Sequence, residues 1–173
     1  SRKEDLKRRL EEIIKRLEEV VRRILRTSEE SLKDHHEASK RLLEESEKSL
    51  KRLEEELKRK DERVIEELVR RHHDLNRRIL EDDKRLLEEH HDLNKKLLEA
   101  VDKLLKEAED VLRKLDKDEE LRKIEERIRE LAKRAREELD KLDKEVRKNH
   151  ERVKRRLEEL DRRAKELVRE ERR

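Results

Sequence analysis

The chain has 173 residues, 61% of them charged and 29% hydrophobic, and it contains no Gly, Pro, Cys, Met, Trp, Tyr or Phe. Without Gly the phosphate-binding loops of nucleotide enzymes cannot form, and without Cys there is no disulfide or thiolate metal site. The 54 basic and 51 acidic residues alternate in sign and leave a net charge of +3, unlike the basic faces of nucleic-acid-binding proteins. We therefore expect neither a nucleotide enzyme nor a nucleic-acid partner.

The first predicted helix covers residues 2–58. From Leu6 to Leu57 the apolar residues recur mostly three, four or seven positions apart, as they do along one face of an α-helix. Thr27 and Glu30 have the spacing of a capping box, which would divide this helix in two. Because the apolar pattern continues through the segment, we favour one uninterrupted helix.

The next two predicted helices cover residues 62–115 and 119–172. Asp61 and Asp118 are the expected N-caps, because each precedes glutamates that suit the positive end of the helix dipole. With short links around residues 60 and 117, three helices of nearly equal length must fold back on one another. The prediction is an all-α, coiled-coil-like, antiparallel (up-down-up) three-helix bundle that forms a single domain over residues 1–173.

Two short motifs recur with the same spacing. HHDLN occurs at His72–Asn76 and at His90–Asn94, and SEESLK at Ser28–Lys33 is followed by SEKSLK at Ser46–Lys51. In both cases the second copy begins 18 residues after the first, which is five turns at about 3.6 residues per turn. Each residue therefore returns to the same face of its helix, and nearly straight helices are predicted.

The polar residues that interrupt the apolar stripes fall at three levels once the helices are laid side by side. The first level holds Ser28, Ser31, His90, Asn94 and Asp143. The middle level holds His35, Ser39, Asp82 and His150, with His36 and Asp83 as alternatives and Asn149 beside them. The third level holds Ser46, Ser49, His72, Asn76 and Asp161. An unpaired buried polar group costs about 1–3 kcal/mol, so these residues are expected to form buried hydrogen-bond networks.

Two kinds of chemistry are suggested by these levels. Ser31, His90 and Asp143 have the residue types of a hydrolase triad, but packed helices without Gly offer no oxyanion hole or substrate pocket. His and Asp are also zinc ligands, yet no two histidines have the i,i+3 or i,i+4 spacing of helical metal sites. We expect no catalytic residues, no metal and no cofactor, with a His/Asp metal binder centred on the middle level as an alternative.

The lack of long apolar runs bears on the membrane partners and the location of the protein. No apolar run approaches the length of a membrane span, and the charged amino-terminal segment has no signal-peptide stretch. We expect no membrane partner and a soluble protein, cytoplasmic in a recombinant host. The apolar residues of each helix suffice for a three-helix core, so a monomer is favoured and a homodimer remains open.

The chain resembles computationally designed helical bundles with buried hydrogen-bond networks. The resemblance covers the whole chain and rests on its twelve residue types, its Leu/Ile/Val/Ala stripes, its charged surface, and HHDLN set against paired serines. In that family such networks generally supply pairing specificity, and those containing His have been used to make bundles respond to acid. The resemblance implies a structural scaffold with no natural enzymatic activity, whose networks fix helix register. A pH-responsive switch or a homo-oligomeric assembly module is the alternative.

Overall fold

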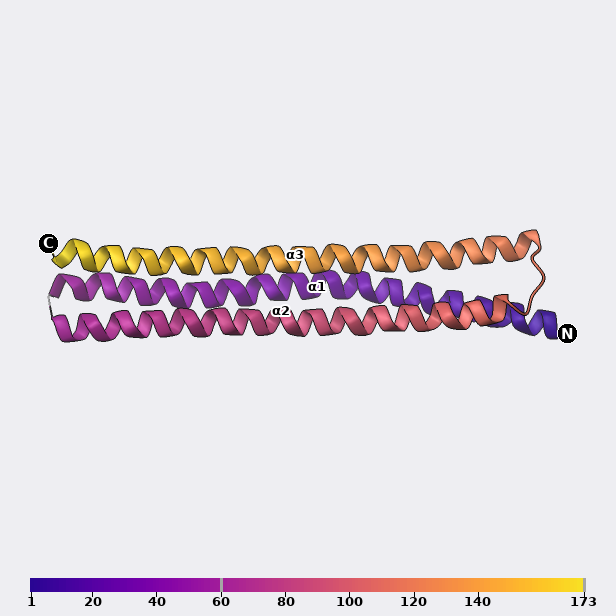
Figure 1. Cartoon of the computed structure of the whole chain (residues 1–173), viewed down its shortest axis with the longest axis horizontal. Coiled ribbons are helices and arrows are strands. Elements are labelled where there is room, and N and C mark those ends of the chain that lie inside the picture. The colour runs from indigo at the N-terminus through magenta and orange to yellow at the C-terminus, as the bar shows by residue number, and fades with distance from the viewer. Residues whose placement is uncertain (60, 173) are drawn as a thin grey trace. The chain divides into compact units, whose positions relative to one another are not determined.

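The structure is a computed structural model that describes residues 1–59 and 61–172. Within these residues there are three helices, α1 (Arg2–Arg59), α2 (Glu62–Leu112) and α3 (Glu119–Arg172), and no strand (Figure 1). The all-α prediction is confirmed, and α1 continues through Thr27 without a break. Residue 60, around which the first link was expected, lies outside the described residues.

Helix α2 ends at Leu112, three residues before the predicted end at 115. The amides of Lys114 and Leu115 donate to the carbonyls three residues back, those of Val111 and Leu112, at 3.1 and 3.2 Å. Bonds of this i→i+3 kind tighten the last turn of a helix and satisfy carbonyls that would otherwise be unpaired. Leu115 therefore keeps the spacing of the apolar stripe and packs against the core without belonging to the helix.

The chain divides into two compact units, each made of one segment from every helix. Unit 1 comprises Ser1–Leu32 and His90–Lys144, and unit 2 comprises Lys33–Glu89 and Glu145–Arg173. That the whole chain is one domain, and that its helices are straight throughout, stays a prediction.

Side-chain contacts give the direction of the segments within each unit. In unit 2, α1 meets α2 through the pairs Ser39–Asp83, Ser46–Asn76 and Ser49–His72, and meets α3 through Ser39–Asn149 and Glu47–Arg156. In unit 1, α1 meets α2 through Arg16–Glu107 and Ser31–His90, and meets α3 through Lys7–Glu120 and Glu18–Arg127. Residue numbers fall along α2 as they rise along α1, and rise together along α1 and α3. Each unit is thus an antiparallel, up-down-up arrangement, as predicted.

The apolar residues form one large core in unit 1 and two smaller clusters in unit 2. The core of unit 1 includes Leu10, Leu17, Ile24, Val101, Ala108, Leu121, Ile128 and Ala135. The clusters of unit 2 are Leu50, Leu53, Leu57, Ile65, Leu160 and Ala164, and, separately, Ile79, Val153 and Leu157. In unit 2, the positions that continue the buried faces beyond and between these clusters are polar, and they form the candidate site. Among the described residues, no helix is long and apolar enough to cross a membrane.

The N-termini of α2 and α3 are capped at the predicted aspartates. Asp61 Oδ1 accepts a hydrogen bond from the amide of Arg63 at 3.2 Å, and Asp118 Oδ1 accepts one from the amide of Leu121 at 2.8 Å. Each carboxylate satisfies an amide that the first turn of a helix leaves without an intrahelical partner. Helix boundaries are therefore set here by Asp rather than by Gly or Pro.

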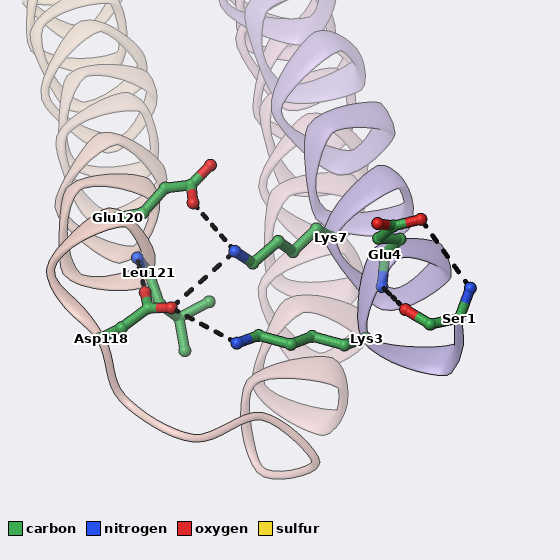
Figure 2. Close-up of polar contacts among 7 residues, drawn as sticks. All are labelled: Ser1, Lys3, Glu4, Lys7, Asp118, Glu120 and Leu121. Carbon is green, nitrogen blue, oxygen red and sulfur yellow. Dashed lines mark hydrogen bonds and ion pairs between the residues drawn. The ribbon is translucent and has the colours of Figure 1, made fainter.

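The cap of α3 is also tied to α1 within unit 1. Figure 2 shows Lys3 and Lys7 of α1 directed at Asp118, each with its Nζ 3.8 Å from Asp118 Oδ2, while Lys7 Nζ also lies 2.9 Å from Glu120 Oε2. The Leu121 amide, with help from the two lysines, lowers the pKa of the Asp118 carboxyl. The cap is therefore held in its ionised, hydrogen-bond-accepting form.

Candidate functional site

The Asn76 layer of unit 2 comprises Ser46, Ser49, His72, Asn76 and Asp161, and the structure brings all five together. Asn76 is at its centre: Oδ1 accepts from Ser46 Oγ, and Nδ2 donates to Asp161 Oδ1 at 2.6 Å. The same Nδ2 lies 3.3 Å from His72 Nε2, which can take its second hydrogen. One side-chain amide on α2 thereby links α1 and α3.

His72 contacts all three helices of unit 2. Its Nδ1 lies 3.0 Å from Ser49 Oγ and its Nε2 lies 3.3 Å from Asn76 Nδ2. The ring also makes a hydrogen bond to the backbone of Leu160 on α3. His72 is completely buried, and the loss of hydration lowers its pKa despite the opposing charge of Asp161. The ring is therefore held neutral at neutral pH.

The Asp83 layer of unit 2 comprises Ser39, Asp83, Asn149 and His150. The Asp83 carboxylate is fully buried and accepts at both oxygens, from Ser39 Oγ at 2.8 Å and from His150 Nδ1 at 2.6 Å. Asn149 Nδ2 donates to Ser39 Oγ at 3.0 Å. A continuous chain of hydrogen bonds therefore crosses from α3 through α1 to α2 and returns to α3.

Asp83, and not the predicted Asp82, supplies this carboxylate. Asp82 is exposed, because one residue along a helix turns the side chain by about 100°, enough to move it from the core to solvent. Asp83 lies seven residues after Asn76 and seven before His90. That heptad spacing between polar core positions is the sequence signal that could have selected it.

His35 was expected in the middle level and lies beside the Asp83 layer. Its side chain is buried, and burial lowers its pKa while the charge of Asp83 opposes the shift. Its Nε2 has no hydrogen-bond partner among the described residues. The contribution of α1 to the network therefore comes from Ser39, and His35 adds a neutral ring packed next to it.

The Asn94 layer of unit 1 comprises Ser28, Ser31, His90, Asn94 and Asp143, and its hydrogen bonds differ from those of the Asn76 layer. Ser31 Oγ lies 2.9 Å from His90 Nδ1. Ser28 Oγ donates at 2.6 Å to the carbonyl of Ile24, one turn back in its own helix. Asn94 is only 8% exposed, yet neither its Nδ2 nor its Oδ1 has a hydrogen-bond partner within the described part of the chain.

The second histidine of each HHDLN motif faces an aspartate of α3. His73 Nδ1 lies 3.2 Å from Asp161 Oδ1, and His91 Nδ1 lies 3.6 Å from Asp143 Oδ1. Neither histidine was among the predicted site residues. The doublet itself is the signal that could have found them, because neighbouring residues on a helix point about 100° apart and so reach different helices.

Each unit also contains a cavity beside a polar layer. In unit 1 a cavity of about 450 Å³ lies between α2 and α3, with His91, Asn94, Leu98, Leu139 and Asp143 among its lining residues. In unit 2 a cavity of about 280 Å³ lies between α1 and α3 and is lined in part by Ser39 and Asn149. Only the larger one adjoins a buried polar side chain that lacks partners, among the residues for which partners are described.

The chemistry available at these layers is hydrogen bonding and proton exchange. Residues 1–59 and 61–172 contain no group of three or more His, Cys, Asp or Glu side chains placed to hold a metal ion. Ser46, His72 and Asp83 are each 0% exposed, so their polar atoms meet other side chains rather than a dissolved substrate.

The comparisons with known proteins yield a structural neighbour. No protein-family model matches the chain, and no curated protein matches its sequence. A solved structure described as "Computationally designed three helix bundle" is similar, with 23% sequence identity and a TM-score of 0.44, over 98% of this chain and 86% of that one.

Proposed function

We propose that the chain is a structural scaffold without catalytic activity, in which buried polar layers fix the register of the helices. The observation that carries the proposal is the Asp83 layer, where a fully buried carboxylate on α2 is held by side chains of both other helices. Charged groups are rarely fully buried unless they are paired. Because burial of this carboxylate is unfavourable without its hydrogen bonds, the layer favours the arrangement of helices that keeps both donors beside Asp83.

Polar and apolar core positions differ in how strongly they discriminate between helix registers. Sliding α1 by a turn, about 5.4 Å, would separate Ser39 from both Asp83 and Asn149 and would leave Asp83 without one of its two donors. Each unpaired group would cost about 1–3 kcal/mol. The apolar stripes discriminate less, because a shift by one heptad places Leu, Ile and Val against other Leu, Ile and Val. The polar layers therefore provide most of the preference for one register.

Thiol crosslinking tests the register directly, because the chain has no cysteine of its own. Glu47 and Arg156 face each other across α1 and α3 of unit 2, with 3.4 Å between Oε1 and Nη2. We would introduce Glu47→Cys with Arg156→Cys for the observed register, and Glu47→Cys with Arg163→Cys for a register one heptad away. The proposal expects a short bifunctional thiol reagent to join only the first pair.

The decisive comparison removes the Asp83 layer by the combined changes Ser39→Ala, Asp83→Leu, Asn149→Leu and His150→Leu. In both proteins the link at residues 113–118 is lengthened with Gly and Ser, so that the link does not itself restrict sliding. If the layer fixes register, the apolar variant crosslinks with both cysteine pairs. Crosslinking of the first pair alone in the variant would show that the Asp83 layer does not set the register.

We also propose that the scaffold acts as a monomer. Support comes from the small number of large apolar side chains that remain exposed. Among the described residues these are Leu93 and Leu98, which are 39% and 37% exposed. Two side chains are far from the apolar area of a stable interface. Light scattering at pH 7 should give one chain mass of 21.5 kDa, and twice that mass would favour the homodimer.

A pH-responsive scaffold is the second candidate, favoured by the burial of His35 and His72. Burial lowers the pKa of both rings below the ordinary 6.5, against the attraction of Asp83 and Asp161. His36 and His150 near the first, and His73 near the second, favour the neutral form as well. As the pH drops below about 6.5, the two rings take up protons in the unfolded chain before they do so in the folded chain. The free energy of unfolding therefore falls with pH in this range. Equal denaturation midpoints at pH 7.5 and 5 would remove this candidate.

A further inference from the structure

The cavity of unit 1, the larger of the two described above, lies beside the Asn94 layer. Asn94 lines that cavity of about 450 Å³, together with His91 and Leu98 on α2 and Arg136 and Leu139 on α3. This volume lies within the range of about 300–1,000 Å³ found for small-molecule sites. The cavity is therefore large enough for a fused-ring compound and has a polar group at its wall.

Asn94 is the polar group that distinguishes this cavity. Its side chain is more than nine-tenths buried, and neither its amide nitrogen nor its amide oxygen has a hydrogen-bond partner among residues 1–59 and 61–172. Asn76, at the same place in the other HHDLN motif, uses both atoms in hydrogen bonds. A buried amide without partners is unfavourable, and a molecule offering one acceptor and one donor would relieve it. Both amide atoms are covered by their surroundings in this structure, so the amide must turn toward the cavity to meet such a molecule, which the broad terminal torsion of Asn allows.

The rest of the lining restricts the charge and shape of that molecule. Leu98 and Leu139 supply an apolar wall, and Leu98 is 37% exposed at the cavity. Arg136 is bonded to Asp102 at 2.9 Å, and Asp140 is paired with Lys144 outside the lining at 3.0 Å. Lys95 and Asp143, the latter 3.6 Å from His91, add one charge of each sign to the lining. A neutral compound suits this balance better than an ion of either sign.

We propose that unit 1 binds a neutral primary carboxamide carried on an apolar ring system, with the ligand amide paired to Asn94 and the ring against Leu98 and Leu139. This site is independent of the scaffold role of unit 2, because it uses the layer whose amide is not consumed by helix–helix hydrogen bonds.

The test is a fluorescence titration of the full chain with 2-naphthamide. The chain has no Trp, Tyr or Phe, so the emission comes from the probe alone. Saturable binding is expected, and Asn94→Leu should weaken it about tenfold, the factor that a loss near 1.4 kcal/mol represents. Asn76→Leu is the matched control: it changes the same motif in unit 2 and should leave the affinity for the probe unchanged.

A second probe separates amide recognition from ring burial. 2-Acetylnaphthalene has the same ring and an acceptor but no donor, so it should bind the parent chain several-fold more weakly than 2-naphthamide. In Asn94→Leu the two probes should bind equally. Absence of saturable binding would overturn the proposal. Equal affinity of 2-naphthamide for the parent and for Asn94→Leu would overturn it as well.

Discussion

The hydrogen bond between Ser46 and Asn76 allows the energetic role of a buried layer to be measured. Both side chains are buried, at 0% and 3% exposure, and Ser46 Oγ donates to Asn76 Oδ1. We consider Ser46→Ala, Asn76→Leu and the double change. Ser46→Ala alone leaves Asn76 Oδ1 buried without this donor, which should reduce the free energy of unfolding by about 1–3 kcal/mol.

The sign of the Ser46→Ala effect should reverse in the Asn76→Leu background. There the serine hydroxyl has already lost its acceptor, and removing it eliminates an unpaired group instead of creating one. The hydroxyl can recover part of the loss by turning to the carbonyl one turn back in α1, as Ser28 does with Ile24. Allowing for that recovery, the coupling energy between the two changes should be at least about 1 kcal/mol.

Urea unfolding followed by circular dichroism at 222 nm measures this coupling, since the chain has no Trp or Tyr to report by fluorescence. The matched control is the pair Ser28 and Asn94, which has the same sequence context in unit 1. Ser28 bonds its own helix, and the Asn94 amide has no hydrogen-bond partner in the described part of the chain, so their coupling should stay within about 0.5 kcal/mol. Equal coupling in the two pairs, or none at Ser46 and Asn76, would refute the reasoning.

Three further outcomes are expected. The free energy of unfolding should fall between pH 7.5 and 5, since burial lowers the pKa of His35 and His72, and His72→Leu should reduce that slope in denaturation curves. Asp83→Asn should destabilise the fold by about 1–3 kcal/mol, because an amide cannot accept at both positions, whereas the exposed Asp82→Asn should stay within about 0.5 kcal/mol. Asp118→Ala should speed hydrogen exchange of the first-turn amides of α3, and unchanged exchange would contradict the cap.

The helices and their ends were predictable because they depend on local rules. Apolar residues at helical spacing define one buried face, and a short polar side chain before a run of glutamates defines an N-cap, as Asp61 and Asp118 show. The end of α2 was harder to place. Leu115 continues the apolar spacing, and only the switch to i→i+3 bonding after Leu112 shows that the helix has stopped.

The polar levels were predictable, but their hydrogen bonds were not. Periodicity places Ser28 and Ser46 at equivalent positions, yet one bonds its own helix and the other bonds Asn76. A serine in a helix chooses between these partners by a single side-chain rotation, which the sequence repeat does not encode. The misplaced Asp82 has a different origin, because two adjacent aspartates differ by about 100° in direction, and level alone does not distinguish them.

The histidine doublets bear on the handedness of each unit. Three helices running up, down and up can be arranged in two mirror-related ways, which differ in the side on which the third helix docks. In unit 2, His72 meets Ser49 of α1 and the next residue, His73, meets Asp161 of α3. A right-handed helix turns from one residue to the next in a single sense, so adjacent residues that serve different partners specify the side on which α3 must lie. The opposite arrangement would direct His73 toward solvent and would separate it from Asp161. The two-residue motif therefore distinguishes between the left-handed and the right-handed arrangement of the three helices.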